Sequence, residues 1–431
     1  MTQHSTTEQQ AVQTADQRQA SGEAWTWHEV THRLGLAELF EAFAQGAAQR
    51  DVERRAIHAE VAQLKERRYG ALRLPTDQGG AGISLPELFH LTRDLATADP
   101  NIAHIFRNHL NAVEQHLTEP SSASSQRLLS IASQGKIIGL ALHEQTNKPS
   151  GQIGRPPGMR LDWSADDQAW RASGVKIYST GNLYSDFILA SASEQDSHRE
   201  RQFLLPSHTE GISLDDDWSG FGQKLTGSGT TVFDKVIVRE SDLFSVPKRG
   251  VVRTPEGEQP LFGFTFHQVY LTSIIVGIVN RIHADALVLV RKRSRNFYHG
   301  LADLPAQEPE VQSTIGRIAA WRSALEAVTD RAAHKLDLAW KAVGTPDAWP
   351  LSLQATLAAS EAKVVVDETA ANLASTLIDV ASGSGVSVQA ALDRHWRNIK
   401  VLSSHNPRTY KERLLGDFYL NGTALPRGAY F

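Results

Sequence analysis

The chain has 431 residues, of which 41% are hydrophobic and 21% charged, so we expect two or three packed units of a globular protein. Its net charge of −4 at pH 7 is spread along the chain, which argues against a nucleic-acid surface because such a surface needs a basic patch. Cysteine is absent, which excludes disulfides, thiolate nucleophiles, cysteine-ligated zinc and iron–sulfur clusters.

Residues 1–22 are rich in Gln, Thr, Ser and Ala and have no apolar periodicity, so we expect a flexible tail. This segment lacks the basic and apolar regions of a secretory signal. The longest apolar run, around Leu271–Val279, is too short to cross a bilayer. We therefore expect no membrane association, and a cytoplasmic location.

The next segment, residues 23–135, has the pattern of a helical domain. Apolar residues recur at three- and four-residue spacing, and a turn-rich break, LPTDQGGAGISLP, interrupts them at Leu74–Pro86. The helical stretches are Val30–Arg68, Glu87–Leu117 and Ser125–Ser133.

From residue 136 to 245 the pattern changes to short β-branched runs separated by Gly, Asn and Asp, such as SDFILASA and TTVFDKVIV. These runs predict an antiparallel β-barrel or sandwich. Ser245–Pro260 is expected to be a linker.

Residues 260–431 carry long apolar stripes, which predict a four-helix bundle followed by a C-terminal tail. The fold class is therefore α+β, with helices first, a β-domain in the middle and a bundle last. The expected bundle helices are Phe264–Arg293, Glu308–Ala342, Leu351–Ala381 and Val386–Arg394.

HEVTH, at residues 28–32, matches the zinc-protease pattern H-E-x-x-H, with Glu29 in the place of the base. Its context is wrong, because it opens the first helix directly after the tail, with no sheet before it. A di-iron site would need Glu-x-x-His repeats in the bundle, and the chain from Phe264 onward contains none. We therefore predict no metal site.

Three histidines, His104, His109 and His116, fall in one helical region. Five- and seven-residue steps do not place all three on one helix face. His109 aligns with the apolar side and is the candidate to face a pocket. The Gly-rich runs GSGTT and SGSGV do not open a helix after a strand, so they predict neither a dinucleotide fingerprint nor a P-loop.

Several segments, in the right order, resemble signatures of the acyl-CoA dehydrogenase superfamily. The resemblance runs from about Val30 to Gly422. The matching segments are LRLPTDQGGAGISLPELFHLTRDLATADPNIAH, SGVKIYSTGNLYSDFILASA, GFGQKLTGSGTTVFDKVIV, RSRNFYHG and DRHWRNIK.

This resemblance implies a flavin between the β-domain and the bundle, with Thr180 near the flavin N5 edge. His143 would face the pyrimidine part of the flavin and Ser228 its phosphate. Arg295 and Phe297, or Arg293 in place of Arg295, would reach the cofactor of a neighbouring subunit in a homotetramer. The other implied cofactor-binding residues are Tyr178, Trp218, Ser382 and Gly383.

The catalytic glutamate of acyl-CoA dehydrogenases has no counterpart here. Aligned through DRHWRNIK, its place is taken by Asn406, preceded by His405, and the first bundle helix has no acid from Gln259 to Ala284. Asparagine cannot accept a proton at neutral pH. Losing a positioned base typically costs about 10²–10⁴-fold in rate. Dehydrogenation is therefore disfavoured.

The branch that best fits these changes is that of the reduced-flavin monooxygenases, which includes the dibenzothiophene and alkyl-sulfur enzymes. The resemblance implies reduced FMN, or FAD, supplied by a separate flavin reductase, and a C4a-hydroperoxide formed with oxygen. His405, with a pKa near neutrality, would orient or protonate the distal oxygen, with Thr180 and Asn406 as further catalytic candidates. The dibenzothiophene enzymes have a second histidine where this chain has Leu402.

The expected substrate is a small organosulfur compound, oxygenated during sulfur scavenging. Besides the initiator, Met159 is the only methionine, and a protein made under sulfur starvation gains from omitting an otherwise useful core residue. The expected pocket is aromatic, with substrate contacts from His109, Phe266 and Tyr270 beside Trp218. An acyl-CoA dehydrogenase with a displaced base, an N-hydroxylase and a non-enzymatic flavoprotein are the alternatives.

Overall fold

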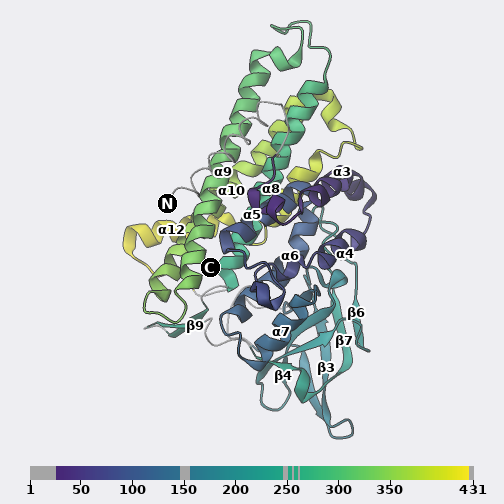
Figure 1. The fold of residues 1–431 in the computed structure, drawn as a ribbon, viewed down its shortest axis with the longest axis vertical. Helices are drawn as coiled ribbons and strands as arrows, with labels where there is room; N and C mark the ends of the chain where they lie inside the picture. The colour runs from purple at the N-terminus through teal and green to yellow at the C-terminus, as the bar shows by residue number, and fades with distance from the viewer. Residues whose placement is uncertain (1–25, 146–155, 246–250, 255–256, 261–262, 427–431) are drawn as a thin grey trace.

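The computed structural model describes residues 26–145, 156–245, 251–254, 257–260 and 263–426. Figure 1 shows a β-sheet at one end of an elongated molecule and three long helices, α8, α9 and α10, reaching the other end. The N-terminal helices lie between them. The α+β, acyl-CoA dehydrogenase-like fold class expected from the sequence is confirmed.

The N-terminal part has six helices within the described residues. The amphipathic stretch Val30–Arg68 is divided into three of them, because the chain turns through left-handed backbone at Gly35 and Arg54. Ser84 and Glu87 cap the next helix reciprocally. The bounds are α2 (Glu29–Arg33), α3 (Ala37–Glu53), α4 (His58–Glu66), α5 (Leu85–Ala98), α6 (Pro100–Leu117) and α7 (Ala123–Ser133).

Helix α6 is the central helix of this part. Asp99 caps it, and Pro100 occupies its first turn, where a missing N–H is tolerated. Nearly all of its side chains are buried, polar ones included. Buried polar groups need hydrogen-bond partners, so α6 is where we look for functional side chains.

The middle part forms one eight-stranded sheet in the order β6-β7-β3-β2-β4-β5-β8, with β1 beside β4. Most pairs are antiparallel, but β1 and β2 each pair with β4 in parallel, which the alternating pattern did not reveal. The strands are β1 (Ile138–Ala141), β2 (Arg160–Ser164), β3 (Ala169–Lys176), β4 (Phe187–Glu194), β5 (Glu200–Pro206), β6 (Ile212–Leu214), β7 (Thr231–Val238) and β8 (Leu243–Phe244).

The expected linker Ser245–Pro260 contains strands in its described residues. Strands β9 (Val251–Thr254) and β10 (Gly257–Pro260) pair antiparallel, separately from the main sheet. These two strands were not predicted from the sequence. Val-Val-Arg-Thr is a short β-branched run of the kind that favours a strand.

The C-terminal part consists of α8 (Gly263–Lys292), α9 (Pro309–Lys341), α10 (Ala348–Ala381), α11 (Asp393–Ser403) and α12 (Arg408–Asn421). The helix expected over Val386–Arg394 was wrong. Ser382 has left-handed backbone, with φ 56°, and residues 382–386 form only a short 3₁₀ turn, η7. Glycine and serine at this turn disfavour continuation of the helix, so α11 begins at Asp393.

Helix α8 is long and apolar enough to cross a membrane, although the apolar run around Leu271–Val279 within it was judged too short from the sequence. Of its most apolar window, 67% is buried inside the protein, where it packs on α5, α6, α9 and α10. Tyr270 donates to the carbonyl of Ala103 on α6 (2.9 Å), and Phe266 packs against Phe89. Helix α8 thus joins the N-terminal helices to the bundle.

Candidate functional site

A cavity of about 510 Å³ lies where all three parts meet, a volume within the range of small-molecule sites. Helix α6, the segments after β1 and β3, the β6–β7 loop, α8 and the end of α11 supply its walls. The lining residues are His104, Arg107, His143, Glu144, Ile177, Tyr178, Thr180, Trp218, Gly220, Phe221, Gln223, Ser228, Leu271, Lys400, Val401, Leu402, Ser404 and His405.

Hydroxyl groups form the wall on the sheet side. The Thr180 and Ser228 hydroxyls are 2.9 Å apart, and Ser228 lies 2.7 Å from the hydroxyl of Thr226. Asn108 on α6 donates to the carbonyl of Thr180 (3.1 Å), which fixes this segment against the helix. The three hydroxyls form one hydrogen-bonded chain, so the direction in which each hydroxyl donates depends on its neighbours.

Two aromatic rings stand beside these hydroxyls. Tyr178 and Trp218 meet edge to face, with centroids 6.1 Å apart, and the Trp218 indole donates to the carbonyl of Gly222 (3.0 Å). Tyr178 has φ 53° and its side chain is 62% exposed. Left-handed backbone at a bulky residue stores strain, which functional sites commonly do.

The opposite wall carries imidazoles from α6 and from the turn after α11. His104 Nδ1 lies 3.1 Å from Gln223 Oε1, so the neutral ring donates there. Its Nε2 has no hydrogen-bond partner among the described residues and is left as an acceptor. Burial, and then the nearby Arg107, lower the pKa of His104 to about 3. His104 therefore stays neutral at physiological pH.

The second imidazole of this wall, His405, receives a hydrogen bond from Arg107, whose Nη1 is 3.2 Å from His405 Nε2. Arginine only donates, so Nε2 accepts and the proton of the neutral ring sits on Nδ1. The pKa of His405 is well below its ordinary value because the cavity walls desolvate the ring and Arg107 repels its cation. His405 is exposed and lines the cavity. The expected pKa near neutrality was therefore wrong.

The β6–β7 loop is fixed to α11 as well as to the segment that follows β3, where Gly181 donates to the carbonyl of Thr226 (2.9 Å). The backbone N–H of Gln223, which has φ 52°, donates to Asn398 Oδ1 (2.7 Å), and Arg397 donates to the carbonyl of Phe221 (3.0 Å). A Cβ on Gly222 would lie 2.3 Å from the carbonyl oxygen of Arg397, so only glycine allows this approach. These contacts align Gln223 with His104.

The expected substrate contacts do not line this cavity. His109 is buried, donating to the carbonyl of Gly70 (3.0 Å) and accepting from the N–H of Ile138 (3.1 Å). Phe266 and Tyr270 lie in the hydrophobic core. Because α6 is buried almost all round, the apolar side of the helix faces protein rather than a pocket.

The expected flavin and catalytic residues are distributed unevenly. His143, Tyr178, Thr180, Trp218, Ser228 and His405 line the cavity. Asn406 does not: it is buried behind the wall, with its amide 3.3 Å from Gln268 Oε1 on α8. Sequence reasoning missed Arg107, Gln223 and Asn398, and set His104 aside. Arg107 and His104 are three residues apart on α6, the spacing that puts both on one helix face, and this signal could have found them.

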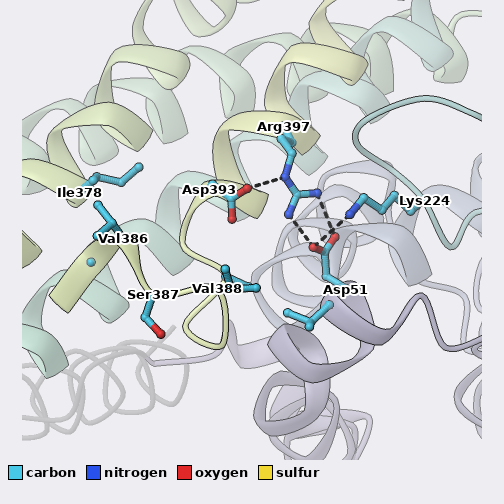
Figure 2. Close-up of a pocket in the computed structure, with 11 residues that line it drawn as sticks. Asp51, Lys224, Ile378, Val386, Ser387, Val388, Asp393 and Arg397 are labelled. Carbon is cyan, nitrogen blue, oxygen red and sulfur yellow. Dashed lines mark hydrogen bonds and ion pairs between the residues drawn. The ribbon is translucent and has the colours of Figure 1, made fainter. Parts of the chain in front are cut away.

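A second cavity, of about 420 Å³, lies at the start of α11 beside η7, whereas the first cavity is lined by the end of that helix. Figure 2 shows its charged side chains turned toward one another. Arg397 binds Asp51 (2.5 Å) and Asp393 (2.8 Å), and Lys224 lies 3.7 Å from Asp51. Gly385 and Val386 of η7 line this cavity, whereas Ser382 and Gly383 precede the lining stretch.

The residues expected to reach a neighbouring subunit follow α8. Arg295 is exposed and Phe297 is 56% exposed. Arg293, the alternative, donates to the carbonyl of Val380 at the end of α10 (3.1 Å) and is engaged within its own chain.

No group of three or more metal-ligating residues occurs in the described part of the chain. His28 of the zinc-protease pattern instead binds Asp94 (2.7 Å) and stacks on His90, at 4.4 Å between centroids.

The first cavity fits a flavin. A planar ring system with donors and acceptors along its edge needs a slot bounded by flat side chains and polar atoms that are not otherwise used. Tyr178 and Trp218 supply flat surfaces. His104 Nε2 and Gln223 Nε2 are buried and have no hydrogen-bond partner in the described residues.

Comparison with known proteins gives similarity to a family model and to named flavin-dependent enzymes. Residues 269–408 match the family model of the acyl-CoA dehydrogenase C-terminal domain. The probable FMNH2-dependent monooxygenase SfnC of Pseudomonas putida is 28% identical, over 89% of this chain and 93% of that protein. Dibenzothiophene monooxygenase of Rhodococcus erythropolis is 24% identical, over 90% and 92%.

Solved structures show the same relationship. Methanesulfinate monooxygenase MsuC of Pseudomonas fluorescens superposes with a TM-score of 0.80 at 26% identity, over 94% of this chain and all of that one. FMN-bound TdsC of Paenibacillus superposes with a TM-score of 0.82 at 22% identity, over the same shares, which shows the fold. This chain therefore has the acyl-CoA dehydrogenase fold and is similar to FMN-dependent monooxygenases that share it.

Proposed function

We propose that the chain is an FMN-dependent monooxygenase that oxygenates a small organosulfur compound. The named relatives support the oxidoreductase class, the FMN cofactor and the organosulfur substrates. The observation that carries the proposal is the composition of the first cavity. It combines hydroxyls, neutral imidazoles and an arginine, and its one carboxylate among the described lining residues, Glu144, is bonded to Lys176.

This composition does not suit proton abstraction from a thioester. A general base must reach its proton in an unprotonated and available form, and Glu144 also accepts from the backbone N–H groups of Gly158 and Met159. The site is instead built to donate and accept hydrogen bonds without gaining charge.

A reduced FMN held in this cavity would supply the two electrons that dioxygen needs, with the balance S + O2 + FMNH2 → SO + FMN + H2O, where S is the substrate. We propose that Thr180 and Ser228 hold the central edge of the flavin. Because Thr226 donates to the carbonyl of Gln223 (2.9 Å), Ser228 donates to Thr226 and Thr180 to Ser228, so the oxygen of Thr180 is left to accept a hydrogen bond from that edge. The Nδ1–H of His405 then donates to the oxygen that is transferred, and Arg107 holds the ring in that tautomer. His104 Nε2 accepts from the same region. Trp218 and Tyr178 offer flat surfaces against which the flavin ring would lie.

The remaining assignments extend this proposal. Reduced FMN comes from a separate flavin reductase, by diffusion or in a complex, and the enzyme works in the cytoplasm during sulfur scavenging. Arg295 and Phe297, being exposed after α8, reach the cofactor of a neighbour in a homotetramer, and Ser382 and Gly383 contact the far end of a cofactor. Asn406 acts indirectly, by supporting the turn that carries His405.

A direct test mixes the full-length protein with chemically reduced FMN and then oxygen, in the presence of sulfones, sulfinates, thioethers, amines and phenols. We expect oxygenated products from the sulfur compounds, identified by mass spectrometry. Turnover of amines alone would favour N-hydroxylation, and flavin reduction by acyl-CoA without oxygen would favour a dehydrogenase.

A further inference from the structure

Arg107 stands at the centre of the polar side of the first cavity. It lies on α6, one turn after His104, is only 7% exposed and lines the cavity. Its guanidinium reaches His405 across the junction between α6 and the turn after α11. A group bound beside the guanidinium is therefore also beside His405.

The charges of the cavity favour a negative ligand there. Arg107 and Lys400 line it as cations, and Glu144 is already bonded to Lys176 and to two backbone N–H groups. The nearby imidazoles of His104, His143 and His267 all have lowered pKa values, with burial as the first cause and Arg107 as the next. They are neutral, so the guanidinium is the cation on the α6 side of this cavity.

We propose that Arg107 selects a small organosulfur anion, a sulfinate, as the substrate of this site. Two parallel N–H groups of a guanidinium match two oxygens on one centre, and such charge-assisted pairs are stronger than neutral hydrogen bonds. A neutral sulfone presents oxygens with less charge, and an ammonium group would be repelled. The inference rests on the proposed function and names its substrate class.

The same chemistry could bind the anionic edge of a reduced flavin, so the two sources must be separated. Position favours the substrate. The residues proposed for the flavin edge, Thr180 and Ser228, come from the sheet side, whereas Arg107 contacts the turn that carries His405.

The experiment measures binding rather than turnover. Full-length protein saturated with FMN is titrated calorimetrically with methanesulfinate, dimethyl sulfone and dimethylamine, and FMN affinity is measured separately by quenching of flavin fluorescence. We expect wild type to prefer the sulfinate. Arg107→Gln should weaken sulfinate binding roughly 10- to 100-fold, the range for a lost hydrogen bond to a charged group, and leave sulfone and FMN binding unchanged. The sulfinate affinity of Arg107→Lys should lie between those of wild type and Arg107→Gln. Lys400→Gln, the matched control, should weaken sulfinate binding less than Arg107→Gln does.

Several results would overturn the inference. If wild type binds sulfinate and sulfone with equal affinity, that measurement alone contradicts the inference. A loss of FMN affinity in Arg107→Gln with sulfinate binding intact would assign the guanidinium to the flavin. If wild type binds no FMN, the proposed function fails, and the anion site is then judged from sulfinate binding alone. Should Arg107→Gln not fold, as checked by circular dichroism, Arg107→Lys and the wild-type selectivity decide.

Discussion

The two cavities at the two ends of α11 differ in whether their polar side chains have partners within the protein. In the second, Arg397, Asp51, Asp393 and Lys224 satisfy one another (Figure 2). In the first, buried atoms such as His104 Nε2 and Gln223 Nε2 have no hydrogen-bond partner in the described chain. Unsatisfied buried polar atoms are rare because they cost stability. The comparison indicates that the ion pairs of the second cavity stabilise the fold, and that polar atoms of the first cavity are available to bind a ligand.

The largest effect should come from breaking the second network. Arg397→Gln leaves Asp51, whose side chain is 3% exposed, without its bidentate partner. Removing one partner of a buried ion pair typically costs about 3–5 kcal/mol. We expect the lower end, about 3 kcal/mol in the free energy of unfolding by urea, because Lys224 still lies near Asp51. A loss below about 1 kcal/mol, typical of surface pairs, would contradict a structural role.

His405→Ala tests the first cavity. In contrast to Arg397→Gln, it should reduce activity and leave the free energy of unfolding nearly unchanged. The ring is exposed toward the cavity, so unfolding should change little. Oxygenation should slow by about 10²-fold, with more hydrogen peroxide released per FMN consumed, since a positioned proton donor is worth about 10²–10⁴-fold. Oxygen uptake and product yield measure this. An unchanged ratio of product to oxygen would remove His405 from the mechanism.

Acidification should destabilise the histidine-rich regions first. Burial lowers the pKa of His104 to about 3 and those of His109, His116 and His395 to about 4. The unfolded chain binds these protons near pH 6.5 and the folded one does not, so stability is complete above pH 6.5 and is lost as pH falls toward 4. Each such proton contributes about 1.4 kcal/mol per pH unit. Urea unfolding at pH 7.5, 6.5 and 5.5 should show this slope, and it should shrink in His116→Gln. A flat profile would mean that these rings are not buried as neutral groups.

The smallest effect is expected from Asp393→Asn. Its carboxylate binds Arg397 but is 63% exposed, one turn away on the same helix. Pairs of this kind contribute about 0.3–0.5 kcal/mol, so thermal unfolding should shift by only a degree or two. A loss as large as that of Arg397→Gln would mean that the network acts as one unit, and would require a double-mutant cycle.

The fold class could be predicted because it depends on periodicity, which is local in the sequence. Errors came where local preference competes with long-range pairing: the parallel partners of β4, the strands in the expected linker, and the turn that delays α11. For the site, family signatures led to Thr180, Ser228 and His405. They did not lead to Arg107, which its spacing from His104 could have indicated. They could not lead to Gln223, because its role depends on a contact between distant segments. The prediction that His109 faces a pocket was wrong because an apolar helix face does not reveal what covers it.

The contacts that close the first cavity have a consequence for how the protein matures. Gln223 meets Asn398 across 175 residues of chain, and Arg107 meets His405 across 298. Contacts of such high sequence separation form late in folding, because the entropy of closing the long loop is lost first. The ligand site is therefore among the last features to form when the chain refolds. Recovery of FMN binding should lag behind recovery of helical circular dichroism. Flavin fluorescence would then report the rate at which the sheet finally packs against the bundle.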